Sequence, residues 1–460
     1  MKTTEDKDPY LSVIIPVHNK QDTLPRLLTA LKEQKPQPSN HEIIFIVDAC
    51  CDRSLQILNL ARQEQCFQIV ETKPARRGPS HARNLGIETA KGKHCLFIDA
   101  DILLPTDFLK IVEHYCQEFP NAVYFPPVYG NSGSLSTWPF LVPNHRSIEE
   151  LNNKELLLWA KAQKSLKDLR LPFVEKSEGW FDCLPAPWVF CWSSVMIVPR
   201  QILLRVGGFY TSFREKGSED LELGYRLHQL RIRFRLMLDT YVFHLPHKRD
   251  RDKEERIDRL QERQMLNMYP TREMEALCSF DGSHANAMIQ CLEVINSETT
   301  NQIKTCWKTS FNVKKLELPD KIPLMIGTPN DWMLSTWKPD YTVNPTTDSS
   351  SQNLSLIGLA LPFDDKTFTS AILVGLWQIL PERLSCRIFQ EALRVAERVF
   401  LLKNSQIPVE SIAWSTDTLA IHDAPYWERT CILRRSFFDF SLTTCGQEGS
   451  IELFQIQYYP

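Results

Sequence analysis

The chain of 460 residues lacks long apolar runs, and none approaches the ~20 residues that a helix needs to span a bilayer. Its amino terminus, Met1 to Tyr10, is polar and acidic, so we expect neither a signal peptide nor a transit peptide. A strong charge of one sign is also missing, because the formal net charge is −3. This near balance argues against a nucleic-acid binder. Together these absences predict a cytoplasmic protein without a transmembrane segment.

The chain contains 13 cysteines, but few of them lie close together in the sequence. They are scattered singly except for the adjacent Cys50 and Cys51, and none forms a C-x-x-C pair or a zinc-type array. Most are therefore expected to be buried thiols in a reducing compartment. Hydrophobic residues at 43% and charged residues at 24% are ordinary for a globular protein. The length predicts two or three domains.

Strands and helices alternate in the first hundred residues. Short apolar runs predict four strands, at Leu11–Pro16, Glu42–Asp48, Gln68–Val70 and Cys95–Ile98. The segments between them carry helical patterns, which predicts a parallel sheet with right-handed crossovers. Open α/β sheets bind their ligands at the carboxyl ends of the strands. The acids that end the second and fourth strands are therefore candidate site residues.

The fourth strand ends abruptly in Asp99-Ala100-Asp101, which holds two carboxylates one residue apart. At the rim of a sheet, this pair supplies two hard oxygen ligands of the kind that divalent metals prefer. The alternative is a strand followed by an ordinary polar turn, because aspartate is common in turns.

Four segments resemble, in order and spacing, the motifs of family 2 glycosyltransferases with the GT-A fold. They are Ile14–Asn19, Ile46–Asp52, Arg77–Ile87 and Asp99–Asp101. The resemblance implies a nucleotide-diphospho-sugar transferase with a mixed, mostly parallel sheet flanked by helices. It also implies that Asp48 faces the nucleotide base, that Arg83 lies near the diphosphate and that Asp101 holds the metal. The full set of implied donor-binding residues is Pro16, Val17, His18, Asn19, Asp48, Arg83, Asp99 and Ala100.

The chemistry of the donor agrees with this resemblance. A nucleoside diphosphate leaving group needs its charge neutralised by Mg²⁺ or Mn²⁺, and these ions prefer carboxylate oxygen. Asp99 would face the ribose or support the metal through water. Two alternatives remain open: Asp48 could cap the helix that follows it, and Arg83 could form a surface ion pair. The sequence Ala49-Cys50 replaces an acid and a glycine found in many members, so the nucleotide base is left undecided.

A second informative segment, Lys216–Leu227, follows a glycine turn and predicts an amphipathic helix that opens on Glu219 and Asp220. Acids at a helix amino terminus are stabilised by the helix dipole, which is one explanation for them. The segment also resembles the catalytic segment of galactosyl- and N-acetylgalactosaminyltransferases. That resemblance implies that Asp220 is the general base for the acceptor hydroxyl and that Glu219 holds the acceptor or donor sugar. An aspartate at this position favours inverting chemistry.

His244 follows a strand predicted at Phe234–Leu238. In the similar transferases, a histidine at this distance from the acidic pair completes the metal site, and His247 is the neighbour to exclude. A lone histidine after a strand is usually structural. With Asp99 and Asp101, however, His244 makes a chemically sensible set of Mn²⁺ ligands.

Regular alternation stops between about residues 125 and 185, where a loop at Phe125–Ser134 and a helical stretch at Ile148–Leu169 are predicted. Two aromatic-rich segments follow at Glu178–Phe181 and Pro187–Trp192. Each ring is expected in the core when considered singly. As a region, the segment is interpreted as an insertion that faces the acceptor, because loops on a scaffold carry specificity.

The last segment resembles the later half of a class I methyltransferase, on the evidence of a strand at Ile322–Gly327, the Leu361-Pro362-Phe363 segment and a helix at Phe389–Val399. Its cofactor loop, Ile326–Asp331, lacks the Gly-x-Gly pattern and contains a proline. The acid expected after the second strand is missing near Tyr341–Asn344. We therefore expect a smaller, Rossmann-like α/β domain that is degenerate and noncatalytic and that serves in acceptor binding or in a homodimer.

The predicted organisation is a GT-A domain at residues 1–250, a helical linker at 251–305 and the methyltransferase-like domain at 306–460. The predicted function is a metal-dependent, inverting glycosyltransferase of the hexosyltransferase class, with a nucleotide sugar as donor and a UDP-sugar favoured. Its acceptor is a glycan, a peptide or a small molecule. Two alternatives remain: a bifunctional enzyme that is also an S-adenosylmethionine-dependent methyltransferase, and an inactive GT-A scaffold that binds a partner.

Overall fold

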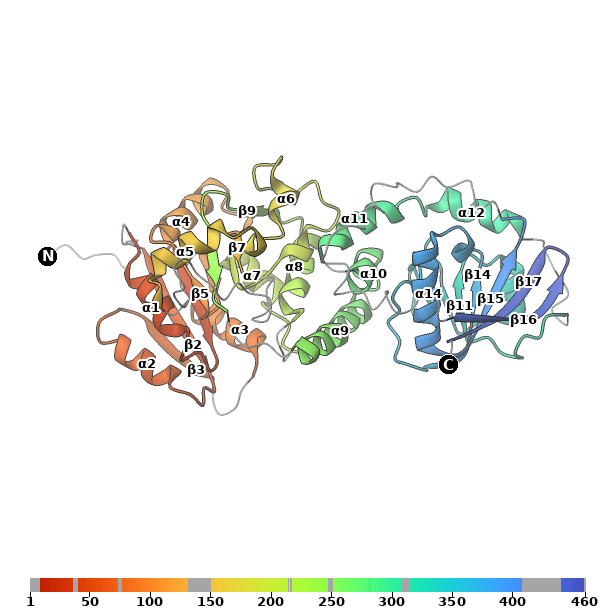
Figure 1. Cartoon of the computed structure of the whole chain (residues 1–460), viewed down its shortest axis with the longest axis horizontal. Coiled ribbons are helices and arrows are strands. Elements are labelled where there is room, and N and C mark those ends of the chain that lie inside the picture. Colours follow the sequence, from red (N-terminus) through yellow and green to blue (C-terminus); the bar gives the residue numbers. More distant parts are fainter. Residues whose placement is uncertain are drawn as a thin grey trace. The chain divides into compact units, whose positions relative to one another are not determined.

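The computed structural model describes residues 9–35, 40–72, 77–130, 150–213, 215, 217–246, 251–280, 282–307, 311, 315–407 and 440–458. The chain divides into two compact units, Met1–Gln261 and Glu262–Pro460. Each unit has its own seven-stranded sheet (Figure 1). Within the described ranges, no helix combines the length and the apolar character that crossing a membrane requires.

The first unit is built on a sheet of order β3-β2-β1-β4-β8-β6-β9. Neighbours from β3 to β4 run parallel, β8 is antiparallel to β4 and β6, and β9 is parallel to β6. A small second sheet has the order β5-β10-β7. The strands are β1 Leu11–Val17, β2 His41–Asp48, β3 Gln68–Thr72, β4 His94–Ile98, β5 Ile102–Leu103, β6 Val123–Phe125, β7 Val128–Tyr129, β8 Val195–Pro199, β9 Phe234–Leu236 and β10 Val242–His244.

Helices of the first unit occupy the segments between these strands. They are α1 Leu24–Lys32, α2 Ser54–Ala61, α3 Pro79–Thr89, α4 Phe108–Glu118, α5 Asn153–Ala162, α6 Leu171–Val174, α7 Arg200–Val206 and α8 Glu219–Gln229, with short 3₁₀ turns at Lys164–Leu166 and Pro187–Phe190. The long helix α9, Arg251–Met268, contains the point at which the two units divide.

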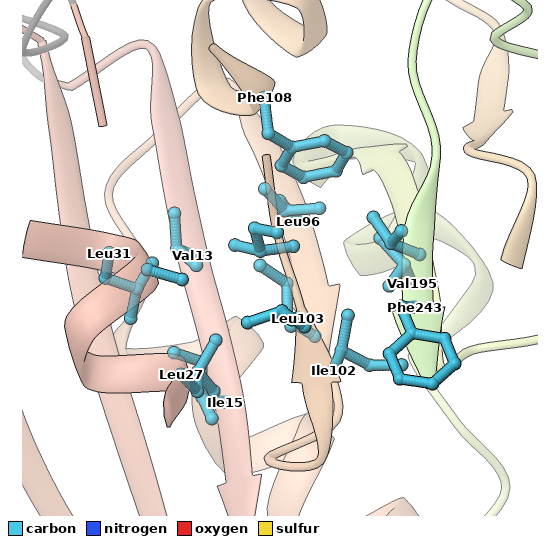
Figure 2. Packing of buried hydrophobic residues seen from close by; sticks show 14 of the residues in the cluster. Val13, Ile15, Leu27, Leu31, Leu96, Ile102, Leu103, Phe108, Val195 and Phe243 are labelled. Atoms are coloured by element: carbon cyan, nitrogen blue, oxygen red, sulfur yellow. The ribbon is translucent and has the colours of Figure 1, made fainter. Parts of the chain in front are cut away.

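Strand β1 shows why helices cover both faces of the sheet. Val13 and Ile15 pack in one core cluster with Leu27 and Leu31 of α1 (Figure 2). Side chains alternate along a strand, so Ile14 points to the other face and meets α3. A Cβ atom on Gly86 of α3 would lie 2.3 Å from Ile14 Cγ2. Glycine at this position therefore lets α3 approach the sheet closely.

The second unit has a sheet of order β13-β12-β11-β14-β15-β17-β16. Neighbours from β13 to β15 run parallel, and β17 is antiparallel to both β15 and β16. The strands are β11 Leu324–Gly327, β12 Tyr341–Val343, β13 Asn353–Leu354, β14 Phe368–Val374, β15 Ala396–Asn404, β16 Phe440–Glu448 and β17 Ile451–Tyr458. The helices are α10 Arg272–Ser279, α11 Gly282–Leu292, α12 Ser297–Cys306, α13 Asp331–Trp337 and α14 Glu382–Val395, with a 3₁₀ turn at Leu376–Gln378.

The predicted fold class is confirmed: a mixed and mostly parallel sheet flanked by helices forms the first unit, and a second α/β sheet forms the carboxyl-terminal unit. Two predicted helices are wrong at their ends. Within the described residues, the helical stretch expected at Ile148–Leu169 is an α-helix only at Asn153–Ala162, with a 3₁₀ turn at Lys164–Leu166. The helix expected at Phe389–Val399 ends at Val395, because Ala396 already pairs with Phe368 of β14 and strand pairing overrides the helical pattern. From residue 131 onward, the loop predicted at Phe125–Ser134 lies outside the described residues.

Candidate active site

The predicted donor-side residues meet at one edge of the first sheet. Strands β1, β2 and β4 are parallel neighbours, so their carboxyl ends lie together. Strand β1 ends at Val17, and residues 18 and 19 follow it. Asp48 is the last residue of β2, and Asp99 directly follows β4. This edge is where a doubly wound sheet binds its ligands.

Asp48 is buried and holds the turn that precedes α3. Its carboxylate accepts hydrogen bonds from the backbone N–H groups of Arg77 and Gly78, both at 3.0 Å, and from the hydroxyl of Thr72. The alternative role of Asp48 as a helix cap is wrong, because Asp52 accepts the N–H of Ser54 at the start of α2. Contact between Asp48 and a nucleotide base stays a prediction.

The segment after β1 is tied to the segment after β2 by several hydrogen bonds. His18 Nδ1 lies 2.6 Å from the carbonyl oxygen of Asp48, and Asn19 Oδ1 accepts the N–H of Cys51 at 2.9 Å. Asn19 and Ala49 both have positive φ angles, of 51° and 48°. Non-glycine residues seldom adopt this region, and it is enriched at sites where structure constrains the backbone.

Arg83 is a buried bridge and not a surface residue. Its side chain is 2% exposed, and its guanidinium donates to Glu219 Oε1 at 2.8 Å and to Asp99 Oδ1 at 3.2 Å. Burial works against the positive charge, but the carboxylates of Asp99 and Glu219 raise the pKa of Arg83 above its ordinary value. The open alternative of a surface ion pair is therefore wrong. Arg83 joins α3, the end of β4 and the start of α8.

Asp101 and His244 lie together because β5 pairs with β10. In that antiparallel pair, Ile102 lies opposite His244. The Nε2 atom of His244 is 3.6 Å from Asp101 Oδ1, and both side chains are buried. The ammonium of Lys20 forms an ion pair with the other oxygen of Asp101.

These residues give a partial set of metal ligands. Among the described residues, no group of three or more His, Cys, Asp and Glu side chains is arranged to hold a metal ion. Of the predicted ligands, Asp101 and His244 are together, whereas the carboxylate of Asp99 pairs with Arg83. His247 lies outside the described residues. One carboxylate and one imidazole still suit Mn²⁺, and Mg²⁺ commonly needs only one or two protein carboxylates beside substrate phosphates and water.

Asp220 is connected to the Asp99 turn through two neighbouring serines. The backbone N–H and the hydroxyl of Ser193 donate to Asp220 Oδ2 at 2.8 and 3.1 Å, and the carbonyl of Ser194 accepts the N–H of Asp99 at 2.8 Å. Burial and the neighbouring Glu219 carboxylate raise the pKa of Asp220 to about 7. This value suits a general base near neutral pH.

Glu219 is fully engaged with protein groups. One oxygen accepts from Arg83 and the other accepts the N–H of Gly217 at 2.8 Å. The side chain is buried, so its described contacts orient the turn before Asp220. A direct contact of Glu219 with a sugar stays a prediction.

Two residues of this region were not selected as candidate site residues from the sequence. Lys20 directly follows the Ile14–Asn19 motif, and that position was the available signal. Gln261 of α9 had no local signal, yet its amide accepts the N–H of Ser218 at 2.7 Å and donates to the carbonyl of Glu215 at 3.0 Å. Gln261 therefore holds the backbone that leads into Glu219 and Asp220.

Three large aromatic residues in and just after the predicted insertion are core residues. Phe181, Trp188 and Phe190 are fully buried, so they do not stack on an acceptor. Nearby, Arg170 and Asp168 form a buried ion pair. The carboxylate of Asp168 also accepts the N–H of Val128 at 2.6 Å. Contact between the insertion and an acceptor stays a prediction, and residues 131–149 are outside the described residues.

Comparison with known families agrees with this geometry. Residues 12–172 match the model of the family described as Glycosyl transferase family 2. The match includes Asp48, Arg83, Asp99 and Asp101, whereas Asp220 and His244 lie beyond it. The galactosyltransferase-like character of the Asp220 segment and the methyltransferase-like character of the second unit stay predictions.

Relatives with assigned names are glycosyltransferases. Validoxylamine A glucosyltransferase of Streptomyces hygroscopicus subsp. limoneus is 26% identical over 242 residues, which cover 52% of this chain and 52% of that protein. Poly(ribitol-phosphate) beta-glucosyltransferase of Bacillus spizizenii is 29% identical over 124 residues, which cover 27% of this chain and 20% of that protein. The chain thus spans about half the length of the first relative and a fifth of the second.

Two solved structures are also similar to this chain. TarS 1–349 of S. aureus in complex with UDP has a TM-score of 0.40 and 17% identity, covering 65% of this chain and 75% of that one. The mannosyltransferase PcManGT from Pyrobaculum calidifontis, in complex with GDP-Man and Mn²⁺, has a TM-score of 0.35 and 17% identity, covering 57% of this chain and 62% of that one.

Proposed function

We propose that this chain is a metal-dependent, inverting glycosyltransferase that moves a sugar from a nucleotide-diphosphate donor, with a UDP-sugar favoured, to an acceptor hydroxyl. The observation that carries this proposal is the link between the Asp99–Asp101 turn and Asp220. Ser194 binds the turn and the adjacent Ser193 binds Asp220. The residue suited to metal binding and the residue suited to proton abstraction therefore belong to one connected site at the carboxyl edge of the sheet.

The match of residues 12–172 to the family 2 model and the named relatives support the reaction class. Validoxylamine A glucosyltransferase and TarS are named for the transfer of glucose and N-acetylglucosamine, and TarS has been solved with UDP-GlcNAc. Their similarity to this chain makes glucosyl and N-acetylglucosaminyl donors the first to test. The acceptor is not indicated by these relatives, because each match covers only part of the relative.

Asp101 and His244 are the residues that would hold a divalent cation. Such a cation would neutralise the charge of the diphosphate leaving group. Lys20, paired with Asp101, places a further positive charge at the same point. Asp220 takes the proton from the acceptor hydroxyl as the hydroxyl attacks the anomeric carbon. Arg83 and Gln261 keep the Asp220 segment in position through Glu219 and Ser218.

The proposal is tested with a panel of UDP-glucose, UDP-GlcNAc, UDP-galactose and GDP-mannose, assayed for release of the nucleoside diphosphate. We expect release from at least one donor in the presence of Mn²⁺, and loss of that release when EDTA removes the metal. Asp101→Asn should lower the rate by about 10²-fold or more, because it removes the charged metal ligand. Asp320→Asn, at an exposed position of the second unit, is the matched control. If no donor releases nucleotide, the alternative of an inactive scaffold replaces the proposal.

The pH dependence of turnover should report Asp220. Because the pKa of Asp220 is raised to about 7 and a general base must be ionised, kcat/KM is expected to rise with pH up to about 7 and then level off. The effect on stability has the opposite sign: a raised pKa contributes stability that is complete below the unfolded value, about 4, and is lost as the pH rises through the folded value.

Ser193→Ala tests whether the inflection of this pH profile belongs to Asp220. The Ser193 hydroxyl donates to the Asp220 carboxylate and so favours its ionised form. Its removal should move the inflection to higher pH while leaving the plateau rate similar. A profile that does not move in Ser193→Ala would assign the inflection to another group.

A further inference from the structure

The carboxyl edge of the second sheet is where an open α/β unit would bind a ligand. From β11 the chain passes outward through β12 to β13, and it resumes on the other side with β14 and β15. The topological switch point, where such sheets hold their ligands, therefore lies between the ends of β11 and β14. In this chain those two ends are joined directly, because the N–H of Thr328 donates to the carbonyl of Val374 at 2.9 Å.

Helix α12 packs against this switch point. A Cβ atom on Gly375, the residue after β14, would lie 2.7 Å from Ile303 Cγ2 and 3.3 Å from Trp307 Nε1. Ile303 and Trp307 are only 2% and 4% exposed. Gly375 has a φ angle of 70° and leaves space that α12 fills. Apolar side chains of the chain itself therefore occupy the position that a cofactor would take.

The same helical segment also contacts the ends of β12 and β15. After β12, Thr346 Oγ1 lies 3.3 Å from Thr300 Oγ1 of α12, and the guanidinium of Arg272 donates to the carbonyl of Pro345. At the end of β15, the buried Asn404 donates to the carbonyl of Cys306 at 2.9 Å. These contacts are polar and specific, so they fix the helices in one position on the edge.

The loop after β13 is held by a single buried carboxylate of α10. Glu275, which is fully buried, accepts four consecutive backbone N–H groups, from Ile357 to Ala360, at 2.7 to 3.4 Å. A carboxylate that meets several N–H groups makes strong, charge-assisted hydrogen bonds. Helices α10 and α12, with Trp307, thus contact the end of β15 and the segments that follow β12, β13 and β14.

S-adenosylmethionine, the cofactor implied by the methyltransferase resemblance, does not fit this edge. Pro329 removes a backbone donor from the loop after β11. Asn344 stands near the position of the missing ribose-binding acid, and its side-chain oxygen is occupied by the N–H and the hydroxyl of Thr346, both at 3.1 Å. Protein side chains therefore fill the space that the cofactor needs. The loop after β11 lacks a backbone donor, and an engaged asparagine stands near the position of the ribose-binding acid.

We infer that helices α10 and α12, with Trp307, permanently occupy the carboxyl edge of the second sheet, so that this unit is a scaffold that takes no adenosine-type cofactor. Helices α10 and α12, which the sequence set apart as part of a linker, are on this inference part of the fold of the second unit. The inference concerns a unit outside the glycosyltransferase site and does not depend on the proposed activity.

Binding to the full chain is the first test. Isothermal titration with S-adenosylmethionine and with S-adenosylhomocysteine is expected to show no saturable heat. Hydrogen exchange should show slow exchange for α12 and for the amides of residues 357–360, unchanged by either compound. Saturable binding, or fast exchange throughout α12, would overturn the inference, because the segment would then be a lid that opens over a ligand.

Glu275→Ala tests the contact that anchors the segment. It leaves four buried N–H groups without their acceptor, which is costly, so exchange of residues 357–360 should accelerate by about 10-fold or more. Glu298→Ala, at an exposed acid of α12, is the matched control and should leave exchange unchanged. Equal exchange in both variants would contradict the anchoring role.

Thr328→Val separates a filled edge from a ligand site even if Glu275→Ala fails to fold. Thr328 Oγ1 is buried and has no hydrogen-bond partner among the described residues. In a filled edge, valine removes an unsatisfied hydroxyl, so exchange of the β14 amides should stay equal or become slower. Thr336→Val, at an exposed position of α13, is the control. Faster exchange in β14 only in Thr328→Val would show that the hydroxyl has a bound partner, against the inference.

Discussion

Replacing Asp220 with asparagine is expected to lower kcat for nucleotide release and sugar transfer by roughly 10²- to 10⁴-fold, the usual contribution of a general base. The change keeps the shape of the side chain and its hydrogen bond from Ser193 but removes the proton acceptor. Stability should not fall, because burial and Glu219 raise the pKa of Asp220 to about 7 and so disfavour the ionised form in the folded state. Steady-state kinetics and thermal unfolding at pH 8 measure both effects.

A matched control distinguishes this loss from a general effect of removing a carboxylate. Asp320→Asn changes an exposed aspartate in the second unit and should leave kcat within a factor of about 2. If Asp220→Asn retains most of the wild-type rate, Asp220 is not the base. If it loses activity together with stability, the role of the residue is structural.

Replacing Arg83 with methionine is expected to destabilise the first unit by about 3–5 kcal/mol, because it leaves the buried Glu219 and the partly buried Asp99 without their counter-charge. Activity should be lost as well, since Arg83 joins the Asp99 turn to the start of α8. Lysine at this position should restore only part of the stability, because one ammonium does not reproduce the two directions of the guanidinium. Urea unfolding of the full chain, followed by hydrogen exchange in β4 and α8, measures the change.

Arg205→Met is the control for this experiment, because Arg205 is an exposed residue of α7 and its loss should change stability by less than about 0.5 kcal/mol. An Arg83→Met protein as stable as Arg205→Met would show that the two acids are relieved in another way, for example by protonation. In that case, stability would fall as the pH is raised above neutrality.

The distance along the chain between interacting site residues explains which predictions succeeded. The order β1, β2, β3, β4 and the placement of Asp48 and Asp99 at strand ends were predictable, because apolar runs and their terminating polar residues are local signals. The role of Arg83 was not predictable, because its partner Glu219 is 136 residues away along the chain. A sequence pattern contains no information on which charges become buried together.

The same distinction applies to the metal ligands and to the second unit. Asp101 and His244 were both selected from the chain, but only the β5–β10 register brings them within 3.6 Å of each other. Residues 251–305 were predicted to be helical, and α9 to α12 lie there. The contacts of α10 and α12 with the strand ends of the second sheet came only from the structure. In particular, Glu275 had no signal in the sequence as the acceptor for residues 357–360.

By itself, the sequence determined the class of fold, the succession of elements and the chemical types available at the strand ends. These depend on the spacing of apolar residues and on turn chemistry, which act over a few residues. The tertiary structure alone decided that Arg83 is buried between two acids, that Ser193 and Ser194 join Asp220 to the Asp99 turn, and that helices fill the second sheet edge. These outcomes depend on distances through space and on exclusion of water, which only the packing of distant segments determines.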